Sequence, residues 1–305
     1  MTKTLRAISR HWQIYAFLLL PTAYLIVFCY VPMAGVQLAF KAYHPLKGIS
    51  GSPWTGFAQF EKFFSSYYFQ RLIVNTLRIS LYALIAGFPI PIAFALLLNA
   101  VPSKRLQKLV QTVTYMPHFI STVVLVGMLL QLFSPIVGLY ANLCRLLGTQ
   151  NPADLFSQPG IFPHLYVWSG VWQSFGWVSI VYIASLSAVS PELHEAAQID
   201  GATRLQRVRH VDFPSLLPTA TIMLILRFGQ VMNVGFEKAF LMQNTLNLRT
   251  SEVISTYVYK IGLGSGGRSD YAYSTAIGLF NSAINLGLIL LVNRVTGKLS
   301  QTSLW

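Results

Sequence analysis

Six apolar runs of about 20 residues each dominate this chain of 305 residues, and each run is long enough to cross a bilayer as one α-helix. Only 10% of the residues are charged and 54% are hydrophobic. Soluble domains carry about a quarter charged residues, so a water-soluble core of this composition would lack polar cover. The sequence therefore predicts an all-α polytopic membrane protein, with residues 1–305 forming a single transmembrane domain. The spans are expected near Ile14–Val36, Ile73–Ala100, Leu109–Phe133, Leu165–Val189, Leu216–Phe236 and Tyr273–Val295.

The net charge of +13 does not indicate a nucleic-acid partner, because the basic residues are scattered between long apolar runs. About half of the 22 basic residues lie in four short segments: the N-terminus, residues 104–108, residues 204–209 and the C-terminal tail. The positive-inside rule places these segments, and hence both termini, in the cytoplasm. The first run follows basic residues as a signal peptide does. It is longer than a typical signal-peptide core and no Ala-x-Ala cleavage site follows, so we interpret it as a retained span.

The sequence offers no cofactor or metal site. Cys29 and Cys144 fall in a predicted span and a predicted external loop, so no disulfide is expected, and no histidine lies at metal-ligand spacing with another ligand. The segment Gly262–Ser269 resembles the phosphate-cradling GxxxxGK[ST] loop, with Arg268 in place of the lysine. That loop works between a strand and a helix. No strand is predicted before it here, so we interpret it as a turn.

Two further patterns concern the loops and spans. Residues Trp54–Phe64 place aromatic side chains on one helical face, which predicts a helix lying in the membrane interface. This helix either orients the second span or docks an external protein. Pro89, Pro91 and Pro117 are expected to bend the second and third spans, because proline removes a backbone donor.

The polar segment Ser190–Pro214, which we call the coupling segment, lies between the fourth and fifth spans. Its spacing predicts a helix, a glycine break at Gly201, a second short helix, and a proline that starts the next segment. The small residues leave little side-chain bulk, so the backbone can sit in a groove of another protein, with charged contacts at the rim. The alternative is a solvated loop with weak surface ion pairs. The residues assigned to coupling are Glu195, Ala196, Ala197, Asp200, Gly201, Arg204 and Pro214.

This segment resembles the signature loop of permease subunits of binding-protein-dependent ABC importers, in which Glu-Ala-Ala, three residues, Gly and nine residues precede Ile-x-Leu-Pro. Val211 and Phe213 depart from that pattern but keep apolar side chains. The chain is most similar to the oligosaccharide and polysaccharide group of the family. The supporting strings begin at Phe88 (Phe-Pro-Ile-Pro-Ile), Tyr115 (Tyr-Met-Pro-His-Phe-Ile-Ser), Gly235 (Gly-Phe-Glu-Lys), Val253 (Val-Ile-Ser-Thr-Tyr-Val) and Thr302 (Thr-Ser-Leu-Trp).

The resemblance implies a six-helix permease of the type I importer fold in a bacterial cytoplasmic (inner) membrane. It also implies three kinds of partner: a second permease that completes a heterodimer, two ABC ATPase subunits and an extracytoplasmic solute-binding protein. ATP would be hydrolysed on the separate ATPase chains, so this chain is expected to be a transporter subunit and not an enzyme.

Polar residues within the spans are the candidates for the substrate pathway. Arg227 is expected near the middle of the fifth span, where a charge costs about 2.5 kcal/mol or more and marks a functional position. Sugars stack on aromatic faces and hydrogen-bond to amides and guanidinium groups. The alternative for the amides is hydrogen bonding between helices, worth about 0.6 kcal/mol per contact. The assigned residues are Trp172, Gln173, Trp177, Arg227, Gln230, Asn233, Asn281 and Asn285.

Arg227 also bears on the cargo. The guanidinium fork matches a carboxylate in two parallel hydrogen bonds, which favours uronate-containing oligosaccharides. The alternative is a neutral sugar, with Arg227 held by an acidic residue of the second permease.

The sequence disfavours two other classes of membrane protein. A self-sufficient secondary transporter or channel for small polar solutes would need paired acidic residues within spans and inverted repeats, and most acidic residues here fall in loops. An intramembrane enzyme would need a nucleophile–base pair or a metal cluster inside the bundle, and no span offers one. The importer permease is therefore the favoured interpretation.

Overall fold

A computed structural model describes residues 10–264 and 269–300, with side chains up to residue 297. The regular secondary structure of this part of the chain is helical, apart from one isolated antiparallel β-bridge between Lys41 and Trp54. The predicted all-α class is therefore confirmed. The chain divides into two compact units, a smaller unit of residues 1–66 and 258–280 and a larger unit of residues 67–257 and 281–305.

The smaller unit begins with one long helical stretch, Trp12–Phe40. The stretch consists of α2 (Trp12–Leu25), the π-helical η1 (Ile26–Tyr30), α3 (Val31–Met33) and the 3₁₀-helical η2 (Ala34–Phe40). Two short helices follow, α4 (Gly48–Gly51) and α5 (Ala58–Phe64).

The prediction of an interfacial helix over Trp54–Phe64 is wrong for its first four residues. Trp54 lies in the β-bridge with Lys41, and Gly56 has a φ of +61°, so the helix α5 begins only at Ala58. The aromatic residues still gather, because the Phe40 ring stacks on Trp54 at 5.8 Å between centroids and meets Phe57 edge-on at 5.5 Å.

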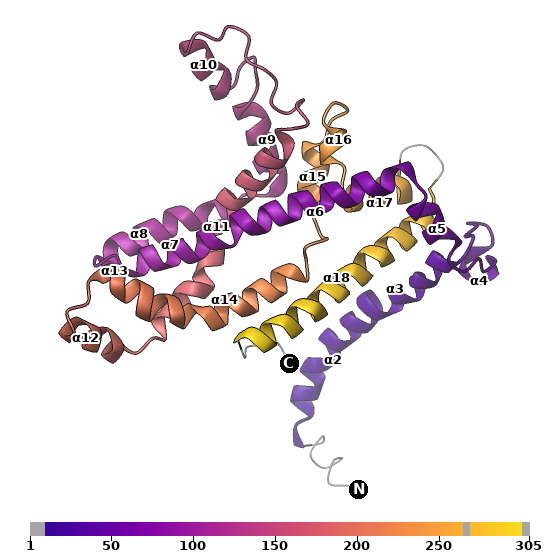
Figure 1. The fold of residues 1–305 in the computed structure, drawn as a ribbon. Coiled ribbons are helices and arrows are strands. Elements are labelled where there is room, and N and C mark those ends of the chain that lie inside the picture. The colour runs from indigo at the N-terminus through magenta and orange to yellow at the C-terminus, as the bar shows by residue number, and fades with distance from the viewer. Residues whose placement is uncertain (1–9, 265–268, 301–305) are drawn as a thin grey trace. The chain divides into compact units, whose positions relative to one another are not determined.

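The larger unit contains most of the helices (Figure 1). Their bounds are α6 (Tyr67–Gly87), α7 (Pro89–Asn99), α8 (Lys104–Tyr115), η3 (Met116–Phe119), α9 (Thr122–Leu132), α10 (Leu139–Leu146), α11 (Phe162–Ser187), α12 (Pro191–Ile199), α13 (Arg204–Arg207), η4 (Val208–Asp212), α14 (Phe213–Phe228), α15 (Phe236–Met242) and α16 (Leu248–Ser251). Two helices, α17 (Ile254–Gly262) and α18 (Tyr271–Ser300), contribute residues to both units.

Four helical stretches in the described residues are long and apolar enough to cross a membrane, and there are six if each of two bent pairs counts as one span. The single stretches are Trp12–Phe40, Tyr67–Asn99, Arg204–Phe228 and Tyr271–Gly297. The bent pairs are Lys104–Phe119 with Thr122–Leu132, and Phe162–Ser187 with Pro191–Ile199.

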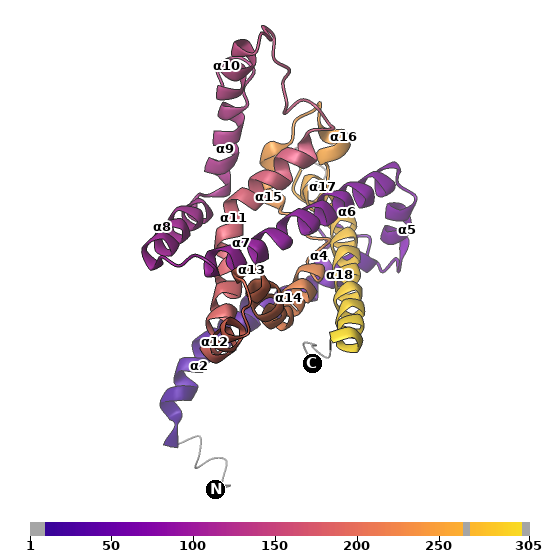
Figure 2. The ribbon, with the colours of Figure 1, turned by 60° about the vertical axis from the view of Figure 1, so that its left-hand side comes forward.

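Two predicted spans are interrupted. The third bends by 97° between η3 and α9, an elbow that Figure 2 shows clearly. Pro117 starts η3 and the Ser121 side chain caps α9, so the local sequence ends one helix and begins another. The fifth span, expected to be helical to Phe236, leaves helical geometry after Phe228 and becomes helical again only at α15. Gly229 and Gly235 border this non-helical segment, 229–235.

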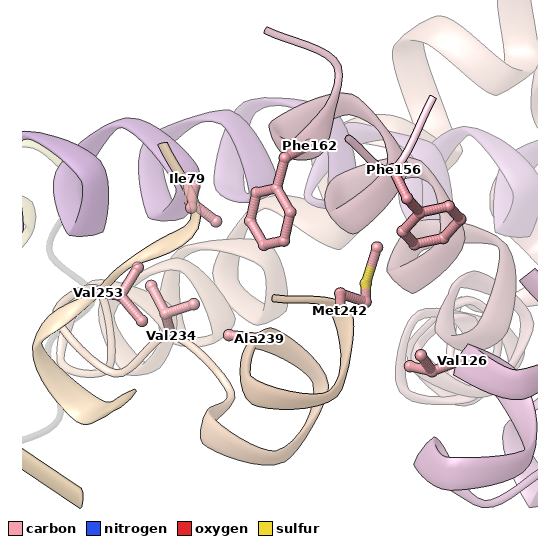
Figure 3. Close-up of a cluster of buried hydrophobic side chains, with 8 residues drawn as sticks. All are labelled: Ile79, Val126, Phe156, Phe162, Val234, Ala239, Met242 and Val253. Atoms are coloured by element: carbon pink, nitrogen blue, oxygen red, sulfur yellow. The ribbon is translucent and has the colours of Figure 1, made fainter. Parts of the chain in front are cut away.

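The core of the larger unit is built around α11, which packs against α6, α7, α8 and α14. One buried cluster joins Phe162 of α11 to Ile79 of α6, Val126 of α9 and Val234 of the non-helical segment, and Met242 of α15 lies in the same cluster beside Phe156 (Figure 3). A second buried cluster joins α7, α11 and α14 and consists of Ile92, Ala95, Tyr182, Leu186 and Leu216. The second cluster holds the start of α14 against α7 and α11, and the first holds the non-helical segment after α14 against α6 and α11.

Candidate functional site

The first half of the coupling segment folds as the sequence predicts. Ser190 caps α12, its hydroxyl accepting a hydrogen bond from the Glu192 amide at 3.3 Å. The helix ends at Gly201, whose φ is +78°. The Ala202 amide donates back to the Ala197 carbonyl at 2.9 Å, as in a Schellman cap. The predicted helix and glycine break are therefore confirmed.

The second half departs from the prediction at its end. Thr203 and Gln206 form a reciprocal capping box that starts α13. The chain then continues through the π-turn η4 into α14, as one helical stretch Arg204–Phe228. Pro214 is the second residue of α14, directly after the π-turn and inside this stretch, so it does not start a separate segment.

The predicted coupling residues lie on the surface. Glu195, Ala196, Asp200, Gly201, Arg204 and Pro214 are exposed, and Ala197 is half-buried. A groove of about 300 Å³ runs between α12 and α13, with Ala197, Asp200 and Gly201 in its wall. Beside the groove, Ile199 is 86% exposed and Leu205 is 77% exposed. Sequence reasoning missed these two exposed apolar side chains.

A buried polar cluster behind the groove was also missed. The Asp212 side chain is only 4% exposed, and its Oδ1 lies 3.3 Å from Nε2 of His194 on α12. The Asn99 side-chain amide, at the end of α7, donates to the same oxygen at 3.3 Å. These residues line a polar cavity of about 330 Å³ together with Arg204 and Arg207. No sequence signal marks this cluster, because its members are far apart along the chain.

The break in the fifth span creates the second candidate site. Arg227 lies in the last turn of α14, not at mid-helix, and a cation there complements the helix dipole. It lines a cavity of about 310 Å³ with Gln230, Asn233 and Tyr166, which we call the Arg227 cavity. A Cβ added to Gly87 of α6 would lie 3.9 Å from Nη1 of Arg227, so the guanidinium extends toward α6.

Four of the predicted amides form one network beside this cavity. The Asn233 amide donates to Oε1 of Gln230 at 2.7 Å. Asn281 and Asn285 of α18 both donate to Oδ1 of Asn233, at 3.0 and 3.1 Å. Oδ1 of Asn285 in turn accepts from the Met232 main chain at 3.0 Å. The network therefore holds the non-helical segment against α18. This arrangement matches the alternative role given to the amides above, hydrogen bonding between helices.

The three residues from the fourth span lie elsewhere. Trp172 lines a separate, apolar cavity of about 530 Å³ between α9 and α11. Gln173 donates to the Ile120 carbonyl at 2.8 Å, in the elbow of the third span. Trp177 stacks on His118 with ring centroids 4.5 Å apart. The structure thus brings five of the eight predicted pathway residues together and places these three outside the Arg227 cavity.

Lys238 was not predicted from the sequence. It lies on α15, outside the candidate spans, and is 8% exposed. Its Nζ donates to the Tyr166 carbonyl at 2.9 Å, on the residue whose side chain helps line the Arg227 cavity. Burial lowers the pKa of Lys238 to about 8. A buried cation next to the cavity adds to its positive potential whenever it is protonated.

The remaining expectations from the sequence concern metal ligands, the cysteines and the glycine-rich segment. Among the described residues, no group of three or more His, Cys, Asp or Glu residues could hold a metal ion. Cys29 and Cys144 are both free thiols. A helix, α17, and not a strand precedes the glycine-rich segment at Gly262, and residues 265–268 of that segment lie outside the described part of the chain. The terminal string at Thr302 also lies outside it.

Comparison with known proteins agrees with the fold. Residues 87–301 match the family described as binding-protein-dependent transport system inner membrane component. The polygalacturonan/rhamnogalacturonan transport system permease protein YteP of Bacillus subtilis is 37% identical over 96% of this chain and 90% of its own length. The protein LplB of Bacillus subtilis is 37% identical over 98% and 93%.

Solved structures give the same result. A chain of a bacterial ABC transporter involved in the import of the acidic polysaccharide alginate superposes with a TM-score of 0.89 and 38% identity, covering 98% of this chain and 100% of that chain. A second structure shows a bacterial alginate ABC transporter in complex with an alginate pentasaccharide-bound periplasmic protein, with a TM-score of 0.89, 37% identity, and 99% and 100% coverage.

These matches cover nearly the whole chain, so it belongs to the family of inner membrane components of binding-protein-dependent transport systems. The chain is therefore a multi-pass membrane permease subunit of an ABC importer and not an enzyme.

Proposed function

We propose that this permease imports acidic, uronate-containing oligosaccharides. The observation that carries the proposal is Arg227, which with Gln230 and Asn233 supplies polar groups to a largely apolar cavity at the break of the fifth span. In the described part of the chain Arg227 forms no ion pair. Glu237, the nearest acidic residue along the sequence, lies on the separate helix α15. A guanidinium at such a position is expensive unless a ligand, water or a partner satisfies it, and a uronate carboxylate would do so.

The relatives support this choice of cargo. One is named for polygalacturonan and rhamnogalacturonan, and the similar solved transporter imports alginate, which its description calls an acidic polysaccharide. The amide network beside the cavity offers further hydrogen-bonding groups for hydroxyls, and Lys238 adds positive charge behind Tyr166.

We further propose the assembly in which the chain works. A second permease completes the pathway, two ATPase subunits bind the coupling segments, and an extracytoplasmic binding protein delivers the cargo. Transport proceeds by alternating access, with both termini in the cytoplasm. The exposed groove between α12 and α13, with Ile199 and Leu205 beside it, offers the apolar and charged contacts that an ATPase surface would need. The purified chain alone in liposomes should therefore give no uptake.

The cargo is tested in the complete transporter, reconstituted with its partners. ATPase stimulation is measured with a galacturonate pentamer and with maltopentaose, each in the presence of the binding protein. Arg227→Gln should reduce stimulation by the galacturonate pentamer about 10- to 100-fold, the effect of losing one charged hydrogen-bonding partner. Arg227→Lys should retain part of it, because the charge remains. Equal loss with both oligomers, or no loss, would contradict an acidic cargo.

A matched control separates this effect from a general loss of charge. Arg78 of α6 is exposed and lies outside the Arg227 cavity. Arg78→Gln removes the same charge and should leave stimulation unchanged with both oligomers.

A further inference from the structure

Asp212 is a buried carboxylate at the point where the coupling segment enters α14. Asp212 as a whole residue is 3% exposed, and an unpaired buried charge is strongly unfavourable. It lies in the π-turn η4, in which the extra residue per turn changes the direction of the following side chains. Arg207, earlier on the same helical stretch, acts on Asp212 electrostatically and lines the same cavity.

Asp212 is also the polar anchor of α12. His194 reaches it with Nε2 at 3.3 Å from Oδ1. In the part of the chain that the structure describes, no other side chain of α12 makes a hydrogen bond or an ion pair outside its own helix and cap. Among the described residues, the His194–Asp212 contact is therefore the polar side-chain link between α12 and the rest of the larger unit.

The Asp212 carboxylate is also linked by hydrogen bonds to the second span and, through it, to the third. Asn99, the last residue of α7, donates to Oδ1 at 3.3 Å. The end of α7 is in turn fastened to α8, because the Gln107 side chain donates to the carbonyls of Leu98 and Val101 at 3.1 and 2.8 Å. Figure 1 shows α12 and α13 at the end of the larger unit where α7 turns into α8.

We propose that Asp212 is a positioning residue for energy coupling: it joins α12 to the end of α7, so that displacement of α12 moves the second and third spans together with the fifth. The junction consists of Asp212, His194 and Asn99. The covalent connection alone would transmit the motion only to α11 and α14. This inference rests on the proposed docking of an ATPase at the coupling segment.

The experiment measures galacturonate pentamer imported per ATP hydrolysed by the complete reconstituted transporter. His194→Ala and Asn99→Ala should each lower this ratio about three- to tenfold, as expected for the loss of one hydrogen bond, while the ATPases remain bound. Asp212→Ala removes both contacts and should lower the ratio at least as much. His194→Gln retains a side-chain donor and should restore most of the ratio. A residue that only stabilises the fold would instead lower assembly and leave the ratio unchanged.

The matched control removes a hydrogen bond between two other helices. Ser185 of α11 and Thr219 of α14 share a bond of 3.0 Å away from the junction, and Ser185→Ala should leave the ratio unchanged. Asn99 is exposed and should tolerate alanine. If Asp212→Ala fails to assemble, import per ATP by Asn99→Ala therefore tests the junction. Normal import per ATP in both His194→Ala and Asn99→Ala would contradict the coupling role of the junction and leave the proposed function standing. Absence of import by the unaltered transporter would overturn the proposed function as well.

Discussion

Lys238 donates a hydrogen bond from its ammonium to the main-chain oxygen of Tyr166 at 2.9 Å, and the same ammonium lies 4.9 Å from the centre of the Tyr166 ring. A carbonyl and an aromatic face stabilise a cation less than a carboxylate does. The contact therefore holds α15 against α11, but it leaves Lys238 sensitive to pH.

The first prediction is a rise in stability with pH that depends on Lys238. Burial lowers its pKa from 10.5 to about 8. Between these values the unfolded chain binds more protons than the folded chain, so the free energy of unfolding increases as the pH rises from about 8 to about 10.5. Below pH 8 the unfavourable burial of the ammonium is fully present. Lys238→Met should remove this rise.

Thermal unfolding of the detergent-solubilised protein at several pH values between 7 and 10.5 measures the effect. Lys47 is exposed, so Lys47→Met should follow the unaltered protein. A parallel rise in Lys238→Met and the unaltered protein would show that another group is responsible.

The second prediction concerns the backbone at Gly201. Its φ of +78° disfavours side chains, whereas a Cβ at this position would meet nothing within 4 Å. Gly201→Val should therefore strain the turn by about 1 to 2 kcal/mol without a clash, and should lower import per ATP while the complex still assembles. Gly201→Asn should have a smaller effect, because asparagine adopts positive φ more readily.

Gly127 provides the matched control for this substitution. It lies within α9, and a Cβ there also meets nothing within 4 Å. Gly127→Val should leave import per ATP unchanged. A normal ratio in Gly201→Val would remove the coupling role of this turn.

The coupling segment shows what a local pattern can predict. A serine cap, small residues and a glycine lie within a short stretch, and each specifies backbone geometry by itself, so α12 and its end at Gly201 were predictable. The groove and the exposed Ile199 and Leu205 follow from that geometry. The junction at Asp212 was not predictable, because it depends on Asn99, which lies 113 residues away along the chain.

The fifth span shows why apolar length alone misleads. Hydropathy continues through Val231, Met232 and Val234, so the run resembles one helix up to Phe236. The polypeptide leaves helical geometry after Phe228, and Asn285 stabilises the break, because its side-chain oxygen accepts from the Met232 amide and its amide group donates to Asn233. The two bordering glycines and the asparagine between them were the available signal. The tertiary contact to α18 that makes the break stable is not encoded locally.

The third prediction tests the packing of α8 on α11. A Cβ on Gly176 would lie 2.3 Å from the carbonyl oxygen of Thr114, a distance that requires the backbones to separate. Gly176→Ala should lower the free energy of unfolding by about 1 to 3 kcal/mol, as overpacking typically does. Gly287 of α18 has nothing within 4 Å of an added Cβ, so Gly287→Ala should be close to neutral. Equal unfolding midpoints for the two variants would argue against this close approach.

The last prediction compares two ion pairs of different burial. Arg71 of α6 pairs with Glu252, whose side chains are 28% and 7% exposed, and Asn75 also donates to the Glu252 carbonyl at 2.9 Å. Glu252→Gln leaves a largely buried guanidinium without its counter-charge and should lower the free energy of unfolding by about 3 kcal/mol.

In the pair Lys62–Asp270 of the smaller unit the charged atoms lie 2.8 Å apart, and the side chains are 56% and 37% exposed. Water and salt screen such a pair, so Lys62→Gln should lower the free energy of unfolding by less than about 1 kcal/mol. Chemical denaturation of both variants in the same detergent gives the comparison. If Lys62→Gln proved as harmful as Glu252→Gln, burial would not be what makes the Arg71 pair important. Added salt should reduce the Lys62 effect further and leave the Glu252 effect nearly unchanged, because buried pairs are screened much less.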